Sequence, residues 1–226
     1  MKILKSLFLF VILVCPTWVE AQKYSIGIAA SPSLTNLRAE NAVLKNDKLY
    51  KPDLGFYAGI NIRRQFGRWA AIRSGFEYEH VAAKINANFT DENGNLLPNA
   101  TVVLHFDYTQ IPLLFEATVG KKTKGILQVG QTFGFLASSS ASFLGFPLSA
   151  GIPPNIEVGF DDRTFNQSLI LGLGAEFPFK KASTLQILCR KSIGITDINN
   201  ENDSIPTKTT SLFLSIGVQY HFINKN

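Results

Sequence analysis

The sequence predicts an all-β protein that folds as an eight-stranded antiparallel up-and-down transmembrane β-barrel. The first observation is that residues 211–222 alternate apolar and polar side chains with a period of two, as does a strand with one apolar and one polar face. The second is that seven earlier segments repeat this alternation. The third is that the connections between segments are alternately long and short, which is typical of outer-membrane barrels.

The first residues of the chain predict a secretory signal peptide. Two lysines precede an apolar run at residues 7–14 that is too short to span a bilayer, and the small residue Ala21 follows it. We therefore expect cleavage after Ala21. Cleavage would divide the chain into a signal peptide, residues 1–21, and an outer-membrane β-barrel domain, residues 22–226.

Composition excludes several classes of protein. Charged residues make up 17 % of the chain, below the usual quarter, and 18 residues are phenylalanine, which suits a surface that partly faces lipid. The formal net charge of +5 is not gathered in one segment, so we expect no nucleic-acid partner. Residues 22–226 contain one cysteine, Cys189, so no intramolecular disulfide is expected.

Four alternating segments lie in the N-terminal half. We expect strands at residues 24–30, 54–66, 69–81 and 102–119. Their apolar faces carry, in this order, Tyr24, Ile26 and Ile28; Phe56, Ile60 and Ile62; Ile72, Phe76 and Tyr78; and Ile111, Leu113 and Phe115. Because successive side chains of a strand point to opposite faces, each segment has one apolar and one polar side.

Four further segments lie in the C-terminal half. We expect strands at residues 125–136, 164–177, 184–195 and 211–222. Their apolar faces carry, in this order, Leu127, Val129 and Phe133; Leu169, Leu171 and Leu173; Leu185, Ile187 and Ile193; and Leu214, Ile216 and Val218. Glycine, glutamine and serine dominate the opposite faces.

The connections alternate in length. Long connections are expected at residues 31–53, 82–101, 137–163 and 196–208, and short ones at residues 67–68, 121–124 and 178–183. Long loops at one end and tight turns at the other describe a barrel in the outer membrane of a Gram-negative cell, with both termini in the periplasm. A soluble lipocalin-type barrel has no reason to alternate its loop lengths in this way.

The polar faces carry charges that we expect inside the barrel. An eight-stranded barrel has room only for side chains or one small ligand, and the bulky apolar faces exceed that volume, so they should contact lipid. The charged residues of the polar faces are Arg63, Arg73, Glu77, Glu79, Glu116, Glu176 and Arg190. We interpret them as a structural salt-bridge network, with a gated ion path or catalytic carboxylates as alternatives.

Residues at the ends of the segments predict contacts with the membrane interface and with the assembly machinery. Tyr24, Trp69 and Phe177 lie at strand ends, where aromatic residues of a periplasmic girdle are expected. The last strand resembles the C-terminal β-signal of outer-membrane proteins, with the assembly-signal residues Ser215, Gly217, Tyr220 and Phe222. Four further residues follow Phe222, where many such signals end.

Three short motifs resemble one family. They are YTQIPLLF at residues 108–115, RKSIGITDI at residues 190–198 and GVQYHF at residues 217–222. Together they resemble the PorT-like outer-membrane β-barrel family of Bacteroidota, although Lys191 stands where an aromatic residue is usual and Ile195 replaces leucine. The resemblance implies the barrel fold and an outer-membrane location. It does not carry the founding member's link to type IX secretion to this chain.

The sequence predicts no enzyme, metal or cofactor. The histidines at positions 80, 105 and 221 are scattered, without the spacing of metal ligands. The serine-rich stretch at residues 138–142 has no histidine or aspartate near it in sequence and is expected to begin a mobile loop. Glycine-containing segments precede no helix and so do not indicate a phosphate site.

The expected function is that of a small integral outer-membrane barrel with a plugged polar lumen, long extracellular loops and a structural or interaction role. The expected partners are outer-membrane lipid and lipopolysaccharide, the assembly machinery, and an extracellular or secretion-system protein. The third long loop, which includes Phe143 and Phe146, is apolar for a surface loop, so we expect it to fold onto the barrel mouth. A narrow pore or small-ligand carrier and a soluble periplasmic lipocalin-like barrel are the alternatives.

Overall fold

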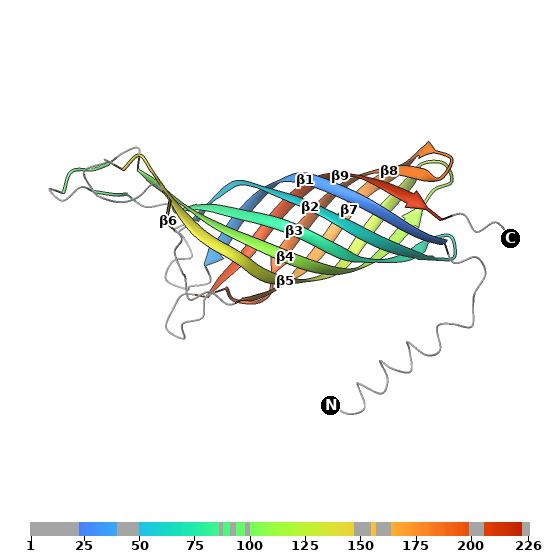
Figure 1. Ribbon diagram of the computed structural model, residues 1–226, viewed down its shortest axis with the longest axis horizontal. Coiled ribbons are helices and arrows are strands. Elements are labelled where there is room, and N and C mark those ends of the chain that lie inside the picture. The colour runs from blue at the N-terminus through green and yellow to red at the C-terminus, as the bar shows by residue number, and fades with distance from the viewer. Residues whose placement is uncertain are drawn as a thin grey trace, which may run out of the picture.

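The computed structural model of the chain is a closed antiparallel barrel, which confirms the predicted fold class (Figure 1). Each long strand pairs with its neighbour along the chain, and the last strand pairs with the first, so the sheet has no free edge. The structure describes residues 23–39, 50–85, 88–90, 94–97, 100–146, 155–156, 164–198 and 206–222. The expected signal peptide lies outside these residues.

Eight long strands and one short strand make up the sheet. They are β1 (Lys23–Ala39), β2 (Tyr50–Phe66), β3 (Ala70–Ile85), β4 (Thr101–Val119), β5 (Lys124–Leu144), β6 (Asn155–Ile156), β7 (Phe165–Lys180), β8 (Ser183–Gly194) and β9 (Thr207–His221). The two-residue strand β6 pairs only with the end of β5, so the barrel wall itself has the eight predicted strands. No helix among the described residues is long and apolar enough to cross a membrane.

Two strands are much longer than the alternation predicted. Strand β1 continues from residue 30 to Ala39, and β5 continues from residue 136 to Leu144. The alternation stops in both places because these parts of the strands extend beyond the apolar belt, where no lipid requires an apolar outer face. The first and third long loops are correspondingly shorter than expected.

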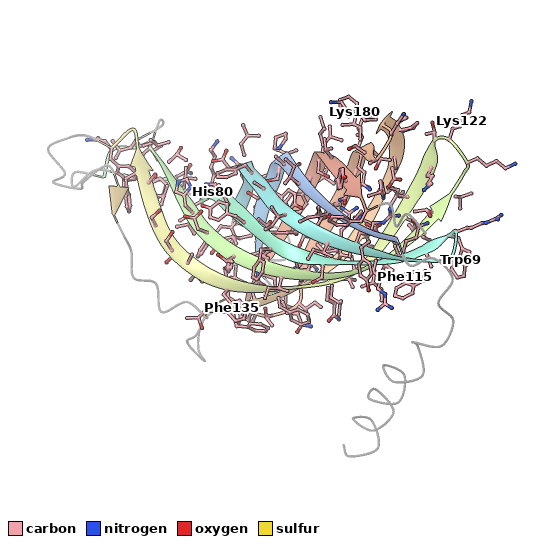
Figure 2. The ribbon with its side chains drawn as sticks, turned by 45° about the vertical axis from the view of Figure 1, so that its right-hand side comes forward. Trp69, His80, Phe115, Lys122, Phe135 and Lys180 are labelled. Carbon is pink, nitrogen blue, oxygen red and sulfur yellow. The ribbon has the colours of Figure 1, made fainter. Side chains whose placement is uncertain are left out.

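The short turns and the chain ends share one end of the barrel, which we call the turn end. Gly67 and Gly120 take positive φ angles of 62° and 124° in two of these turns, a conformation that side chains with a Cβ rarely adopt. The Phe222 amide donates to the Tyr24 carbonyl at 2.9 Å, which joins the residue after β9 to the start of β1. Figure 2 shows Trp69, Lys122 and Lys180 at this end and His80 toward the opposite loop end.

Apolar side chains cover the outer wall and polar side chains fill the interior. Phe76, Leu173 and Ile216 are 61 %, 64 % and 59 % exposed, whereas Glu116 and Gln128 have no exposed surface. This distribution is the reverse of that in a soluble protein, and it suits a wall surrounded by hydrocarbon. Phe115 and Phe135 project from this outer wall in Figure 2.

A cluster of buried apolar residues closes the loop end. Its buried members include Leu37, Val81, Val102, Leu104, Phe106 and Ile198. Phe143 and Phe146 pack against it, and Phe146 lies edge-on to Phe89 with ring centroids 5.2 Å apart. The end of β5 and the first loop residues, up to Phe146, therefore fold onto the barrel mouth as expected. Residues 147–154 and 157–163 of this connection lie outside the described residues.

The exposed apolar wall predicts a large cost for a charge at its centre. Ile216 lies midway along the outer face of β9, so Ile216→Arg should lower the free energy of unfolding by about 2–4 kcal/mol. Urea titration of the barrel in phospholipid vesicles measures this change. Leu96→Arg is the matched control, because Leu96 is 65 % exposed in the connection between β3 and β4 at the loop end. Equal effects of the two substitutions would contradict a lipid-facing wall.

Candidate functional site

Seven charged side chains lie inside the barrel. Arg63 comes from β2, Arg73, Glu77 and Glu79 from β3, Glu116 from β4, Glu176 from β7 and Arg190 from β8. None is more than 3 % exposed. The alternation of each strand points these side chains inward, and closure of the sheet brings residues more than a hundred positions apart within contact of each other.

Glu116 is the centre of the layer nearest the turn end. Its two carboxylate oxygens lie 2.6 Å from the Nε atoms of Arg63 and Arg73. Gln128 donates a further hydrogen bond to Glu116 at 2.6 Å. Two guanidinium groups and one amide therefore surround a carboxylate that has no contact with solvent, and each partner comes from a different strand.

Glu176 extends this layer across the barrel. It lies 3.3 Å from Nη1 of Arg63 and accepts a hydrogen bond from Gln186 at 2.8 Å. Gln186 in turn accepts a hydrogen bond from Arg73 at 2.6 Å, and Lys124 approaches Glu176 at 3.6 Å from the turn end. The layer thus joins β2 and β3 to β7 and β8 through the lumen.

Arg190 is the centre of a second layer, nearer the loop end. Its Nη2 atom lies 3.2 Å from Glu77, and its Nη1 atom donates to the Tyr57 hydroxyl at 3.1 Å. Tyr57 donates to Glu77 at 2.8 Å, which completes a triangle. The guanidinium also lies 5.0 Å from the centre of the Tyr57 ring and 5.9 Å from that of Phe213, distances at which cation–π attraction acts.

Glu79 belongs to the same layer but is held by neutral groups. It accepts hydrogen bonds from Gln110 and from Ser211, the latter at 2.5 Å. Gln219 donates to Asn61 at 2.5 Å on the β9 side of the lumen. Neutral amides and hydroxyls thus occupy space between the charged groups.

The aromatic and assembly-signal residues lie at the turn end and along the closing seam. Tyr24, Trp69 and Phe177 are partly exposed on the outer wall, as are Tyr220 and Phe222, whose rings meet edge-on at 5.5 Å. Ser215 points inward and donates to the Leu188 carbonyl at 3.2 Å. Gly217 lies opposite Ala29 of β1, and a Cβ at this position would come within 2.8 Å of the Ile28 carbonyl oxygen. The seam between β1 and β9 therefore has no room for a side chain at Gly217.

The sequence prediction for the histidines and the serine-rich stretch was wrong in part. His80 and His105 are not scattered, because the pairing of β3 with β4 brings their ring nitrogens within 3.3 Å, beside Asp107. Residues 138–142 belong to β5 and not to a loop, and Ser138 and Ser142 join the same cluster. His221 lies apart, 3.0 Å from the Thr184 hydroxyl at the turn end. Cross-strand register brings the cluster together, and a single sequence does not reveal it.

No metal site is apparent in the part of the chain that the structure describes, since it contains no group of three or more histidine, cysteine, aspartate or glutamate side chains placed to bind an ion. Cys189 is exposed on the outer wall and unpaired with another cysteine. What the lumen groups do chemically is to neutralise and cross-link one another.

The chain is similar to one known protein family and to several solved structures. The family model described as "Outer membrane protein beta-barrel domain" matches residues 20–200. No curated protein matches the sequence. Similar solved structures include Ail, the attachment invasion locus protein of Yersinia pestis, with 13 % identity, a TM-score of 0.41 and coverage of 90 % of this chain and 100 % of that chain. Neisserial surface protein A has 14 % identity, a TM-score of 0.46 and coverage of 90 % and 100 %. OprG from Pseudomonas aeruginosa has 11 % identity, a TM-score of 0.44 and coverage of 90 % and 97 %.

The contacts of Glu116 predict that its carboxylate is required for stability. Glu116→Ala leaves Arg63 and Arg73 buried without their shared partner, which should lower the free energy of unfolding by about 3–5 kcal/mol. Glu116→Gln keeps the shape but removes the charge, so it should also destabilise the barrel. Urea titration in lipid vesicles measures both changes.

Lys122→Ala is the control for this experiment, because Lys122 is exposed in a short turn and its removal should change stability by no more than about 0.5 kcal/mol. An effect of Glu116→Ala as small as that of Lys122→Ala would show that the network does not stabilise the barrel.

Proposed function

The chain belongs to the outer membrane protein β-barrel domain family and is located in the outer membrane, and from this premise we propose that it is a sealed integral barrel with a structural or interaction role at the cell surface. Its outer wall contacts outer-membrane lipid. Its interior serves stability and not transport or catalysis. The strands that extend beyond the lipid belt present the surface for an extracellular partner.

The filled interior is the observation that carries this proposal. The two charged layers occupy the lumen from Glu116 and Glu176 to Glu77 and Arg190 with directly bonded side chains. Beyond them the apolar cluster around Val81 and Phe106 covers the loop end. A conducting pore needs a continuous file of water, and a ligand carrier needs an enclosed cavity, so both are less well supported than a plugged barrel.

The extended loop-end strands support an interaction role. Strand β5 is 21 residues long, whereas about ten residues suffice to cross a membrane. Strands β1 and β4, with 17 and 19 residues, are also longer than this. The part that lies beyond the belt is ordered sheet, which offers a rigid surface to a lipopolysaccharide or a protein.

The finer family assignment is also a proposal. We assign the chain to the PorT-like branch on its three motifs at residues 108–115, 190–198 and 217–222. The structure places Gln110, Arg190 and Gln219 of these motifs in the lumen. A role in type IX secretion is not part of the proposal.

A sealed lumen predicts an absence of channel activity. Purified barrel inserted into planar bilayers should give no unit conductance steps, because in this proposal the side chains of the charged layers and of the apolar cluster block the path of water. An open porin inserted in the same way is the positive control for the bilayer. Reproducible steps that change in size in Arg190→Ala would instead establish the narrow pore.

Targeting depends on the two ends of the chain in this proposal. Residues 1–21 act as the cleaved signal peptide, and Ser215, Gly217, Tyr220 and Phe222 act as the signal read by the assembly machinery. A chain that ends at Val218 loses both aromatic residues and the last pairs of β9 with β1, namely Gly27↔Gln219, Ile26↔Tyr220 and Ser25↔His221.

This truncated chain should therefore fail to assemble, as measured by the loss of the mobility difference between boiled and unboiled samples. Tyr220→Phe is the matched control, since it keeps the aromatic ring and should assemble normally. The intact mass of the assembled protein should correspond to a chain that begins at Gln22. Normal insertion of the truncated chain, or a mass that includes residues 1–21, would contradict the proposed targeting.

A further inference from the structure

A hydrogen-bonded chain of polar side chains lies on the outer wall, just beyond the lipid belt. At a rise of about 3.3 Å per residue and a tilt of about 40°, a strand climbs roughly 2.5 Å per residue along the barrel axis. His80 follows Trp69 by eleven positions and so lies about 28 Å above it, whereas the apolar belt is about 25 Å tall. These hydrogen-bonded side chains therefore lie at the level of the outer-leaflet headgroups.

A β-bulge turns the serines of β5 toward this outer wall. The register of β4 and β5 shifts between Asp107 and Tyr108, so that Asp107 pairs with Ser138 while Tyr108 pairs with Leu136. The extra residue, Ala137, reverses the parity of β5, and Ser138, Ser140 and Ser142 face outward beside Asp107 and His105 on the neighbouring strand. Bulges of this kind re-aim side chains next to functional sites.

Four side chains form a continuous relay in this region. Ser142 Oγ lies 3.1 Å from His105 Nε2, and His105 Nδ1 lies 3.3 Å from His80 Nε2. His80 Nδ1 lies 2.7 Å from Asp107 Oδ1. Ser138 donates to the other carboxylate oxygen of Asp107 at 2.7 Å, and Phe56 stacks on the His80 ring at 5.5 Å. Asp107 and the His80 ring thus each have a further group that holds them in place.

The hydrogen bonds of the relay have one consistent direction. An ionised Asp107 can only accept, so His80 Nδ1 donates to it and His80 Nε2 is left to accept from His105 Nδ1. His105 Nε2 is then the basic nitrogen, and it accepts from the Ser142 hydroxyl. Burial of the ring lowers the pKa of His105, which favours the neutral base.

The environment of Asp107 keeps its carboxylate ionised at the end of the relay. Burial alone would raise the pKa of its carboxyl, but hydrogen bonds from Ser138, Tyr78 and His80 outweigh burial and hold the pKa below its usual value. The carboxylate is therefore ionised at neutral pH and fixes the tautomer of His80.

Apolar hollows on the lipid-facing wall lead up to the relay. One of about 550 Å³ has a floor of small residues, Ala29, Ala58 and Gly59, between Ile28, Phe76 and Tyr78. A second, of about 340 Å³, continues toward Ile62 and Ile111 and shares Ile60 and Phe76 with the first. The Tyr78 hydroxyl donates to Asp107 at 2.6 Å, so the upper edge of the hollows touches the relay. Their position within the belt makes a lipid acyl chain the natural occupant.

We propose that Ser142 is the nucleophile of a site that cleaves the ester bond of an acylated lipid in the outer leaflet. His105 acts as the general base, while His80 and Asp107 are positioning residues that orient it. The hollows would receive an acyl chain while the ester lies at headgroup level beside Ser142. This activity goes beyond the proposed function, and it is independent of whether the lumen conducts because the site lies on the outer wall.

The chemistry balances with water as the only further reactant. Ser142 Oγ attacks the ester carbonyl carbon while its proton passes to His105 Nε2. The ester C–O bond then breaks, and the departing alkoxide takes that proton. Water next attacks the acyl-serine with His105 again as base, which releases a fatty acid and restores the Ser142 hydroxyl.

A fluorophosphonate probe tests the nucleophile directly, because it labels serines that have an adjacent base. We expect the full-length barrel in detergent micelles to be labelled and the Ser142→Ala variant to lose the label. The labelling rate of His105→Ala should fall by about 100-fold or more. Ser140→Ala is the matched control, since Ser140 faces outward on the same strand and pairs with His105. Its labelling should equal that of the unaltered protein.

Heat-modified electrophoretic mobility confirms that each variant is folded. No labelling of the unaltered protein, or equal labelling of a folded Ser142→Ala variant, would overturn the proposal. Fatty-acid release from mixed micelles then identifies the source of the ester, with phospholipid in one arm and lipopolysaccharide in the other. Release in neither arm would overturn the lipid substrate even if the probe labels Ser142.

The pH dependence of probe labelling shows whether Asp107 positions the base or only stabilises the fold. The groups that face His105 are Ser142, Asp53 on β2, Tyr78, His80 and Lys84 on β3, and Asp107 on β4. Labelling should rise with pH through the lowered pKa of His105, because only the neutral ring is a base. The Asp107 charge raises the pKa of His105, so Asp107→Asn should move the midpoint to lower pH and reduce the plateau. A reduced amount of folded protein with an unchanged midpoint would show that Asp107 is structural only.

Discussion

The need to pair every backbone polar group inside hydrocarbon determines this structure. A strand in lipid has no water to bond its amides and carbonyls, so the sheet must close, and β9 closes it against β1. Closure requires a tight seam, which explains the glycine at position 217 opposite Ala29. Closure also creates an interior that is too narrow for all the bulky apolar side chains of the strands and too dry for unpaired charges. The outward apolar wall and the inward polar network are both consequences of it.

The interior satisfies this constraint by pairing charges across the barrel. Burying Glu116 would be unfavourable alone, but the guanidinium groups of Arg63 and Arg73 contact both of its oxygens. Arg190 and Glu77 are paired in the same way nearer the loop end. These contacts join strands that do not neighbour each other in the sheet, so they add cross-links that the backbone ladder lacks. The same contacts occupy the lumen, so one set of side chains would account both for stability and for the proposed seal against water.

Within the lipid belt, the architecture follows from the sequence, and beyond the belt it does not. Residues such as Ile216 and Arg190 alternate because lipid lies on one side and the lumen on the other, so strand number, order of faces and positions of the short turns were predictable. Above the belt, serine, threonine and asparagine occupy both faces of the extensions of β1 and β5, so the regular apolar alternation ends there and the extensions were missed. The partners of each lumen charge depend on register across the barrel. The bulge at Ala137 and the meeting of His80, His105 and Asp107 depend on register too, and spacing along the chain does not encode it.

The apolar wall of this barrel faces lipid and not a ligand or a core. Spin labels on β9 test it most directly, placed singly at Leu212, Leu214, Ile216 and Val218 in a Cys189→Ser background and reconstituted in lipid vesicles. All four positions should collide often with oxygen, which dissolves in hydrocarbon, and rarely with a water-soluble nickel complex, with the largest contrast at Ile216. Frequent collision with the nickel complex and little with oxygen would place this face in water and contradict the account.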